Sequence, residues 1–183
     1  MGLFNRFRKS KTFVEHSALV SFTDPQFGEF SFIKDLCWFE GAISIQGKEI
    51  SVTLETKEGL KTLHYLYPNI EDFIEKASRY AAERLLESSN VYGYDAWASE
   101  LINENGLPHM VEDEFNVWLS QNLPNKKYLP LKAEDFIKRI RLLCIHISEY
   151  NAYSLIYDDG DLFWGHQISV DGDIESGFTN ADI

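Results

Sequence analysis

The sequence predicts an α+β fold, in which antiparallel strands from the N- and C-terminal parts of the chain form one sheet or two packed sheets and a helical middle segment packs on one side. Two changes of hydrophobic period carry this prediction. Apolar and polar residues alternate over residues 18–56 and again over 139–180, whereas apolar residues recur at helical spacing over 69–138. With 183 residues, 44% of them hydrophobic, the chain is long enough to bury the core of one domain. We therefore expect a tail at 1–17 and a single folded domain at 18–183.

The first eleven residues, MGLFNRFRKSK, differ in charge from the rest of the chain. They hold four of the 17 basic residues and no acidic one, so the remainder carries 13 basic against 29 acidic groups. Leu3, Phe4 and Phe7 fall at helical spacing beside these cations, an arrangement that permits weak contact with an anionic membrane. We favour the simpler interpretation, a basic tail that places a few aromatic side chains on the domain.

The net charge of −12 limits the partners that the chain can bind. A strongly acidic protein repels phosphate backbones, so we expect no nucleic acid partner, and a basic protein fits better. The sequence contains no apolar run of about 18 residues and no signal-peptide pattern at its start. We therefore expect a cytoplasmic protein without stable membrane insertion.

The N-terminal strands are expected to form two hairpins. Residues 19–23 and 29–33 alternate in hydrophobicity on either side of DPQFG, whose aspartate, proline and glycine favour a turn. In GAISIQGKEISVTLE, a two-residue turn at Gly47 and Lys48 predicts the cross-strand pairs Ile45 with Ile50 and Ile43 with Val52. All four of these side chains then share one face of the sheet with Leu54.

Helices are predicted in the middle of the chain. Asn69 is a suitable N-cap for IEDFIEKASRYAAERLLESS, whose apolar stripe comprises Ile70, Phe73, Ile74, Ala77, Ala81 and Leu85. Shorter helices are expected at 96–104, 112–121 and 133–138. We interpret Trp97, Leu101, Phe115, Trp118 and Leu119 as the buried faces of the first two, rather than as a cofactor-binding cluster.

The C-terminal part is expected to form a four-stranded antiparallel meander from RIRLLCIHI, AYSLIY, DLFWGHQISV and DIESGFTNADI. A turn at Asp159 and Gly160 predicts three cross-strand pairs: Tyr157 with Leu162, Leu155 with Trp164, and Tyr153 with His166. Leu162, Trp164 and His166 would then project from one face of a strand, with Phe163 on the other. A second turn is expected at Asp171 and Gly172.

The carboxylates of DDGDLFWGHQISVDGD have two interpretations. Asp158, Asp159 and Asp161 resemble a cation site in composition, but their spacing does not match a calcium-binding loop. Aspartate and glycine also tolerate the backbone of tight turns, which explains the pattern without a ligand. We therefore assign no metal site and no cofactor, and we expect these aspartates to form turns.

The candidate binding residues are His166, Trp164, Tyr153 and Asp161. A histidine opposite Tyr153 and beside Trp164 could act as a general base or bind an anion. No zinc-binding spacing, nucleophile elbow or glycine-rich phosphate loop accompanies it, and a shared metal with His146 lacks a third ligand. We therefore favour a structural histidine, and we assign no catalytic residue. Cys37 and Cys144 lie in apolar runs and are expected to be inert core residues.

Two segments, LCWFEGAISIQGKEISVTLE and DLFWGHQISV, resemble a family of uncharacterised, mostly bacterial proteins classed as a domain of unknown function. Members share a WFEG-type segment near the start and an LFWGH segment near the C-terminus, and the resemblance covers about residues 29–183. It implies a small soluble protein and carries no activity over to particular residues.

Two functional hypotheses follow from the sequence. The leading one is a non-enzymatic, acidic, cytoplasmic interaction protein, for example an immunity protein that masks a basic toxin. It depends on the charge and on the catalytic signatures that the sequence lacks. The alternative is a small-molecule-binding domain or enzyme with a pocket around Trp164, His166 and Tyr153. A deep cavity reaching His166 would favour the alternative.

Overall fold

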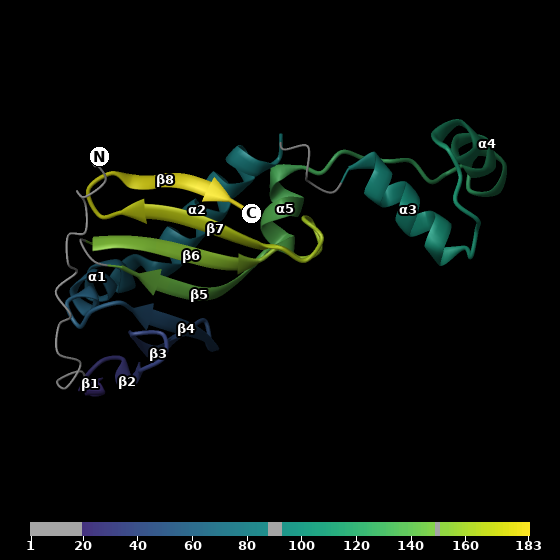
Figure 1. Cartoon of the computed structure of the whole chain (residues 1–183). Helices are drawn as coiled ribbons and strands as arrows, with labels where there is room; N and C mark the ends of the chain where they lie inside the picture. Colours follow the sequence, from purple (N-terminus) through teal and green to yellow (C-terminus); the bar gives the residue numbers. More distant parts are fainter. Residues whose placement is uncertain (1–19, 88–92, 149–150) are drawn as a thin grey trace, which may run out of the picture.

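An eight-stranded sheet organises the computed structural model, which describes residues 20–87, 93–148 and 151–183 (Figure 1). The strands lie in sequence order, and every neighbouring pair is antiparallel except β4 and β5, which are parallel. Their bounds are β1 Phe22–Asp24, β2 Gly28–Ile33, β3 Trp38–Ile45, β4 Lys48–Leu54, β5 Arg141–Ile147, β6 Ala152–Asp158, β7 Gln167–Asp173 and β8 Gly177–Asp182. The parallel pair joins the N-terminal hairpins and the C-terminal meander into one sheet, so the predicted α+β fold is confirmed.

One face of the sheet is covered by helices. These are α1 Gly59–Leu66, the short 3₁₀ helix η2 Tyr67–Asn69, α2 Ile70–Leu85 and α5 Ala133–Arg139. The long helix α2 runs behind the strands in Figure 1 and contacts β7, β8 and α5. Its predicted apolar stripe faces the core: Ile70, Ala77, Ala81 and Leu85 are buried. Asn69 occupies the N-cap position, although its side chain makes no capping hydrogen bond.

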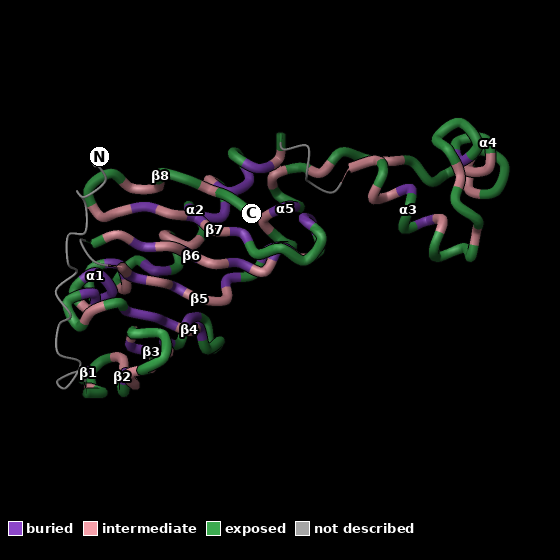
Figure 2. The backbone as a smooth tube through the Cα atoms, viewed as in Figure 1, coloured by how far each residue is buried: buried purple, intermediate pink, exposed green. Residues whose placement is uncertain are grey.

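Side chains from alternate strand positions form the core beneath these helices. Buried residues follow one face of strands β3 to β7, and Figure 2 shows them concentrated in the sheet and in α2. The largest fully buried side chains of this core are Tyr157, Phe30, Phe39, Phe136, Phe163, Leu54, Leu63, Ile145, Ile147, Leu155 and Leu162. The opposite face of the sheet carries mainly polar side chains, as an antiparallel sheet open to water on one side requires.

The helices α3 Tyr94–Glu104 and α4 Glu112–Asn122 form a separate helical lobe, defined here as residues 93–125 (Figure 1). Both helices were predicted within two residues of these bounds. The lobe has a small core of its own, made of Ala98, Leu101 and Phe115, with Trp97, Trp118 and Leu119 partly buried around it. The predicted buried faces of these two helices are therefore confirmed.

The sequence analysis did not predict α1. This helix has eight residues and no acidic residue in its first turn, and Glu58 at its N-cap makes no side-chain capping bond. Local propensity therefore gives little signal. Tertiary packing holds the helix instead: Gly59, Thr62, Leu63 and Leu66 are buried. A Cβ on Gly59 would lie 3.1 Å from the Ile147 side chain, so this glycine permits close packing against β5.

The predicted pairing of β3 with β4 is wrong by two residues. Ile45 lies opposite Lys48, and Ile43 lies opposite Ile50. The turn is formed by Gln46 and Gly47, which both have positive φ, at 51° and 75°. Because a shift of two residues keeps the same side chains on the same face, the predicted burial of Ile43, Ile45, Ile50, Val52 and Leu54 is confirmed.

The predicted hairpin between β6 and β7 is also wrong. Tyr157, Leu155 and Tyr153 pair with Ile168, Val170 and Gly172, six residues further along the chain than expected. Residues 159–166 form a loop, so Leu162, Trp164 and His166 do not project from one face of a strand. Asp171 and Gly172 lie within β7, and the second turn falls at residues 174–176. The four-stranded meander itself is confirmed.

Two further expectations concern single residues and the N-terminus. Cys37 is exposed with a positive φ of 58°, so it is not the core residue that was predicted, and Cys144 is partly buried. The predicted basic tail at 1–17 lies outside the described residues. Among the residues that the structure describes, none of the helices is both long enough and apolar enough to span a membrane.

Candidate functional site

The structure does not bring the four candidate binding residues predicted from the sequence together at one site. Tyr153 is buried on the helix-covered face of the sheet, with its ring centroid 5.1 Å from that of Phe73. His166 is exposed at the end of the loop before β7. Trp164 and Asp161 lie together in that loop, where Trp164 is 70% exposed. The expected pocket around Trp164, His166 and Tyr153 is therefore not formed.

The loop that carries Trp164 is organised by the buried carboxylate of Asp159. Its Oδ1 accepts a hydrogen bond from the N–H of Asp161 (3.1 Å), and its Oδ2 accepts from the N–H groups of Phe163 (2.7 Å) and Gly165 (3.1 Å). Leu162 and Phe163 turn into the core as a result, whereas Trp164 points outward. The expectation that the DDGD aspartates form a turn is confirmed here, in a wider loop than predicted.

The outward side of this loop meets helix α3 at a cavity of about 260 Å³, called here the α3–loop cavity. Asp161, Leu162 and Trp164 line one wall. The opposite wall comes from the lobe and consists of Ala96, Ser99, Glu100 and Asn103. Two of the four sequence candidates thus reach a shared cavity, although their neighbours come from a helix far away in the sequence.

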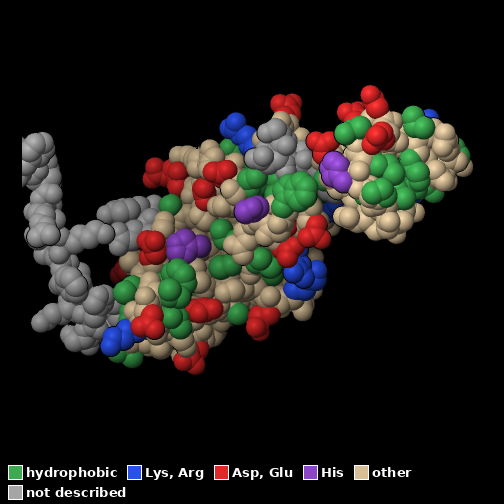
Figure 3. Space-filling view, turned by 45° about the vertical axis from the view of Figure 1, so that its right-hand side comes forward, with side chains coloured by type: hydrophobic (Ala, Val, Ile, Leu, Met, Phe, Trp, Pro, Cys, Tyr) green, Lys and Arg blue, Asp and Glu red, His purple; other side chains and the backbone are tan. Residues whose placement is uncertain are grey.

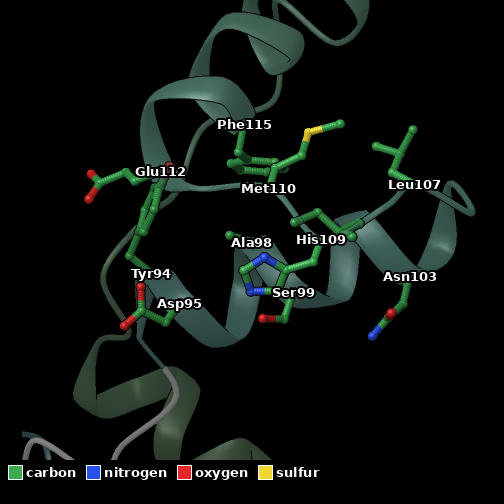
Figure 4. Close-up of a pocket in the computed structure, with 11 residues that line it drawn as sticks. Tyr94, Asp95, Ala98, Ser99, Asn103, Leu107, His109, Met110, Glu112 and Phe115 are labelled. Atoms are coloured by element: carbon green, nitrogen blue, oxygen red, sulfur yellow. The ribbon is translucent and has the colours of Figure 1, made fainter.

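A larger cavity of about 390 Å³, the α3–α4 cavity, lies between α3 and the segment that leads into α4 (Figure 4). In Figure 4 the imidazole of His109 lies near Ser99, while Asp95 and Glu112 lie beside Tyr94 at one end. Apolar side chains complete the walls: Ala98, Ile102, Leu107, Met110 and Phe115. Ser99 and Asn103 of α3 line this cavity and also the α3–loop cavity. The two cavities therefore lie beside the same helix.

The charge of the lobe is entirely negative. Residues 93–125 contain six carboxylates and no lysine or arginine; the six are Asp95, Glu100, Glu104, Glu112, Asp113 and Glu114. Burial, together with the charges of Glu112 and Asp95, raises the pKa of Tyr94, and the hydrogen bond to Asn116 opposes this rise. The negative charges of Glu112 and Asp95 are therefore felt at the end of the α3–α4 cavity where Tyr94 lies.

A second group of polar residues crosses the uncovered face of the sheet. Cross-strand pairing places one residue from each of six neighbouring strands in a row: Glu40, Thr53, His146, Ser154, Asp171 and Asn180. Asp171 accepts hydrogen bonds from the hydroxyls of Ser154 (2.6 Å) and Ser169 (2.7 Å). In the other half of the row, Thr53 Oγ1 and His146 Nδ1 form a hydrogen bond of 2.7 Å. The second ring nitrogen of His146, Nε2, lies 3.5 Å from the carboxylate of Glu55, which is outside the row.

The geometry of this row favours a structural role. Thr53 is 7% exposed, so its hydroxyl is poorly accessible to a substrate. Burial raises the pKa of the neighbouring Cys144 thiol, which keeps it protonated rather than nucleophilic. Within the row, Thr53 pairs with His146 and Ser154 pairs with Asp171, so these polar groups satisfy one another's hydrogen bonds. The described residues include no group of three or more His, Cys, Asp or Glu side chains placed to hold a metal ion.

Sequence reasoning missed the residues of the α3–α4 cavity. Asp95, His109 and Glu112 match no motif, and each alone is an ordinary surface residue. A signal was nevertheless present, because no lysine or arginine occurs between Arg84 and Lys126. That gap marks an acidic segment, but only the packing of α3 against α4 shows that the segment encloses a cavity.

The fold and these cavities define an α+β protein that carries an acidic, cavity-bearing helical lobe beside one end of its sheet. The chain belongs to the family described as an uncharacterised protein conserved in bacteria (DUF2262), whose model matches residues 24–183. The resemblance noted from the sequence is therefore confirmed. Neither a curated protein nor a solved structure matches the chain.

Proposed function

We propose that the chain is an acidic, cytoplasmic, non-enzymatic binding protein whose helical lobe binds a basic protein. An immunity protein that masks a basic toxin is one concrete form of this function. The observation that carries the proposal is the composition of the lobe: six carboxylates, no lysine or arginine, and two cavities along α3. Such a surface attracts cationic partners and repels anionic ones.

The surface of the lobe supports binding as well as attraction. Figure 3 shows acidic and exposed hydrophobic side chains next to each other on the lobe. On the lobe, Val111 and Val117 expose 60% and 57% of their surface, and in the β6–β7 loop beside the lobe Trp164 exposes 70%. Protein interfaces combine an apolar centre with a polar or charged rim, and tryptophan is among the side chains that contribute most to affinity.

The test is the salt dependence of partner binding. The purified chain is immobilised, exposed to a native bacterial lysate, and eluted with sodium chloride rising from about 50 to about 500 mM. We expect basic proteins to be retained and then released as salt screens the charges. Retention of acidic proteins, or binding unaffected by salt across this range, would contradict the proposal.

A matched pair of variants locates the binding surface once a partner is in hand. Replacing Glu104 and Asp113 of the lobe with Gln and Asn removes two charges, and so does replacing the exposed Glu49 and Glu83 with Gln. We expect the lobe variant to weaken partner binding about threefold at low salt, because nearby charges act most strongly. Equal effects of the two variants would show that net charge, not the lobe, is responsible.

A small-molecule-binding domain or enzyme is the second candidate, and one observation favours it. Trp164 and Asp161 line the α3–loop cavity, which has room for a small ligand. A thermal-shift screen of small molecules tests this function. Hits whose stabilisation disappears in Trp164→Ala but persists in His166→Gln would support it, whereas hits insensitive to Trp164→Ala would not.

A further inference from the structure

We propose that the α3–α4 cavity holds an arginine side chain of the basic partner, with the guanidinium beside Tyr94, Asp95 and Glu112. This inference rests on the proposed function and names the chemical group that the lobe recognises. The cavity volume of about 390 Å³ accommodates one long side chain, and both helices contribute to its walls.

The walls of the cavity separate into an apolar part and an acidic part. Leu107 lies at the end remote from Tyr94 in Figure 4, and Met110 and Phe115 lie above His109. These side chains suit the methylene stem of a long amphipathic residue, which buries apolar atoms while its charged end reaches polar groups. A wholly polar ligand, such as a hydrated metal ion, would leave this apolar surface without a partner.

The acidic part favours a cation with several hydrogen-bond donors. Asp95 and Glu112 accept hydrogen bonds in their ionised forms, and both are close enough to Tyr94 to contribute to its raised pKa. The Tyr94 hydroxyl already donates to Asn116 Oδ1 at 2.6 Å, so its oxygen remains an acceptor. Neither lysine nor arginine lines the cavity, so no permanently charged side chain of the lining neutralises these carboxylates.

Arginine fits these features better than lysine does. Its planar guanidinium presents five donors that can bridge two carboxylates, and the same plane stacks on an aromatic ring. Tyr94 supplies that ring between Asp95 and Glu112 (Figure 4). The ammonium of lysine is a compact charge that cannot stack in this way. We therefore expect discrimination between the two residues at this cavity.

The experiment uses the full chain and three fluorescent probe peptides of identical length. The first is rich in arginine, the second has lysine at each of those positions, and the third has citrulline, which keeps the shape of arginine without its charge. Fluorescence anisotropy gives the affinity for each. We expect the arginine peptide to bind about tenfold more tightly than the lysine peptide, and the citrulline peptide to bind most weakly. Free agmatine, a small guanidinium compound, serves as a competitor that distinguishes a small-molecule ligand from a protein side chain.

Two cavity variants and one matched control test the position of the site. Asp95→Asn and Glu112→Gln each remove one charge from the cavity, whereas Glu104→Gln removes one charge from α3 outside it. We expect each cavity variant to weaken arginine-peptide binding about tenfold. The control should change binding less than about twofold, because an exposed charge away from the cavity acts only through screened attraction. Circular dichroism melting verifies that all three variants fold.

A second kind of variant tests the cavity volume rather than its charge. Ser99→Trp places a large side chain in the shared wall of both cavities without changing the net charge. We expect it to abolish the preference for arginine over lysine. Ser120→Trp, on the exposed side of α4, is the control and should leave the preference intact.

The outcomes separate this inference from the proposed function. If the chain binds both basic peptides in a salt-dependent manner, but with equal affinity and without sensitivity to Asp95→Asn or Ser99→Trp, the arginine pocket is wrong while the basic partner stands. If the chain retains no basic protein from the lysate, the proposed function itself fails. Tight binding of agmatine with no binding of the arginine peptide would make the cavity a small-molecule site and overturn the assignment to a protein partner.

Discussion

At the scale of single residues, Asp159 shows how one buried carboxylate determines the path of a loop. Its carboxylate accepts hydrogen bonds from three backbone N–H groups of the loop. Between these donors, the side chains of Leu162 and Phe163 are buried in the core. The exposure of Trp164 depends on this arrangement, since the loop reverses direction around the carboxylate. Two of the three aspartates that resembled a cation site, Asp158 and Asp159, therefore accept hydrogen bonds from N–H groups of their own loop.

Replacing Asp159 with Asn is expected to lower the free energy of unfolding by about 2–3 kcal/mol, because the amide group offers one acceptor oxygen where the carboxylate offers two. Asp161→Asn removes the same charge from an exposed side chain and should change stability by less than about 0.5 kcal/mol. Urea denaturation of both variants provides the measurement. Equal losses would show that the loop does not depend on Asp159.

Tyr153 gives a prediction for alkaline pH. Burial, followed by the charge of Asp173, raises its pKa from 10.0 to about 12. A group whose pKa is higher in the folded state stabilises the fold below its unfolded pKa, and this stabilisation is lost as the pH rises. We therefore expect the free energy of unfolding to fall between about pH 10 and 12.

Tyr153→Phe should reduce the slope of that fall, because phenylalanine has no proton to lose. Unfolding measured in guanidinium chloride across the same pH range tests this expectation. The slope should not vanish, since burial also raises the pKa of Tyr157. An unchanged slope in Tyr153→Phe would mean that other groups control alkaline unfolding.

At the scale of elements, the turn between β3 and β4 tests the corrected register. Gly47 has a φ of 75° and Gln46 a φ of 51°, a backbone that favours glycine and asparagine. Gly47→Val should therefore destabilise the protein by about 1–2 kcal/mol, whereas Gln46→Asn should stabilise it slightly. Thermal unfolding of Gln46→Asn distinguishes the observed register from the one first expected. In the expected register Gln46 lies in a strand, where Asn would lower the stability.

The sequence predicted which elements form better than how they join. The period of the apolar residues identified α2, both helices of the lobe and the C-terminal meander. The same period could not distinguish Ile45 opposite Ile50 from Ile43 opposite Ile50, because both arrangements bury the same face. Leu162 and Phe163 are adjacent and both buried, and Phe163 packs on Phe136 of α5. Such a pattern arises from tertiary packing, and alternation cannot reveal it.

The candidate site was predictable only in part. Trp164 and Asp161 were identified by composition, and both line a cavity. Tyr153 and His166 were joined to them by a strand register that the loop invalidates. The facing wall comes from α3, more than fifty residues earlier in the chain, and no local pattern specifies which helix lies against which loop.

At the scale of the whole molecule, the sheet and the lobe bury separate sets of residues. The main core includes no residue of the lobe, and the lobe core consists of Ala98, Leu101 and Phe115 with their neighbours. Helices α2 and α5, which flank the lobe in sequence, contact each other directly. The sheet with its covering helices therefore closes without the lobe.

Replacing residues 90–128 with a short Gly/Ser linker should leave a folded protein that no longer binds the basic partner. The strand signals of the far-ultraviolet circular dichroism spectrum and a cooperative unfolding transition should persist, because the main core is intact. Binding of the arginine-rich peptide should disappear. A linker variant that fails to fold would show that the lobe contributes to the stability of the sheet after all.

The parallel contact between β4 and β5 has a consequence for how the protein folds and for how its family can vary. Each half of the sheet consists of strands that are near neighbours in the chain, so each can form early from local contacts. The pairing of β4 with β5 brings together two strands that are more than eighty residues apart in the chain, and we expect it to form last. Closure entropy rises only slowly with length, by about 0.6 kcal/mol for each doubling. The lobe lies within this connection, so the lobe can change in size and sequence while the sheet assembles as before.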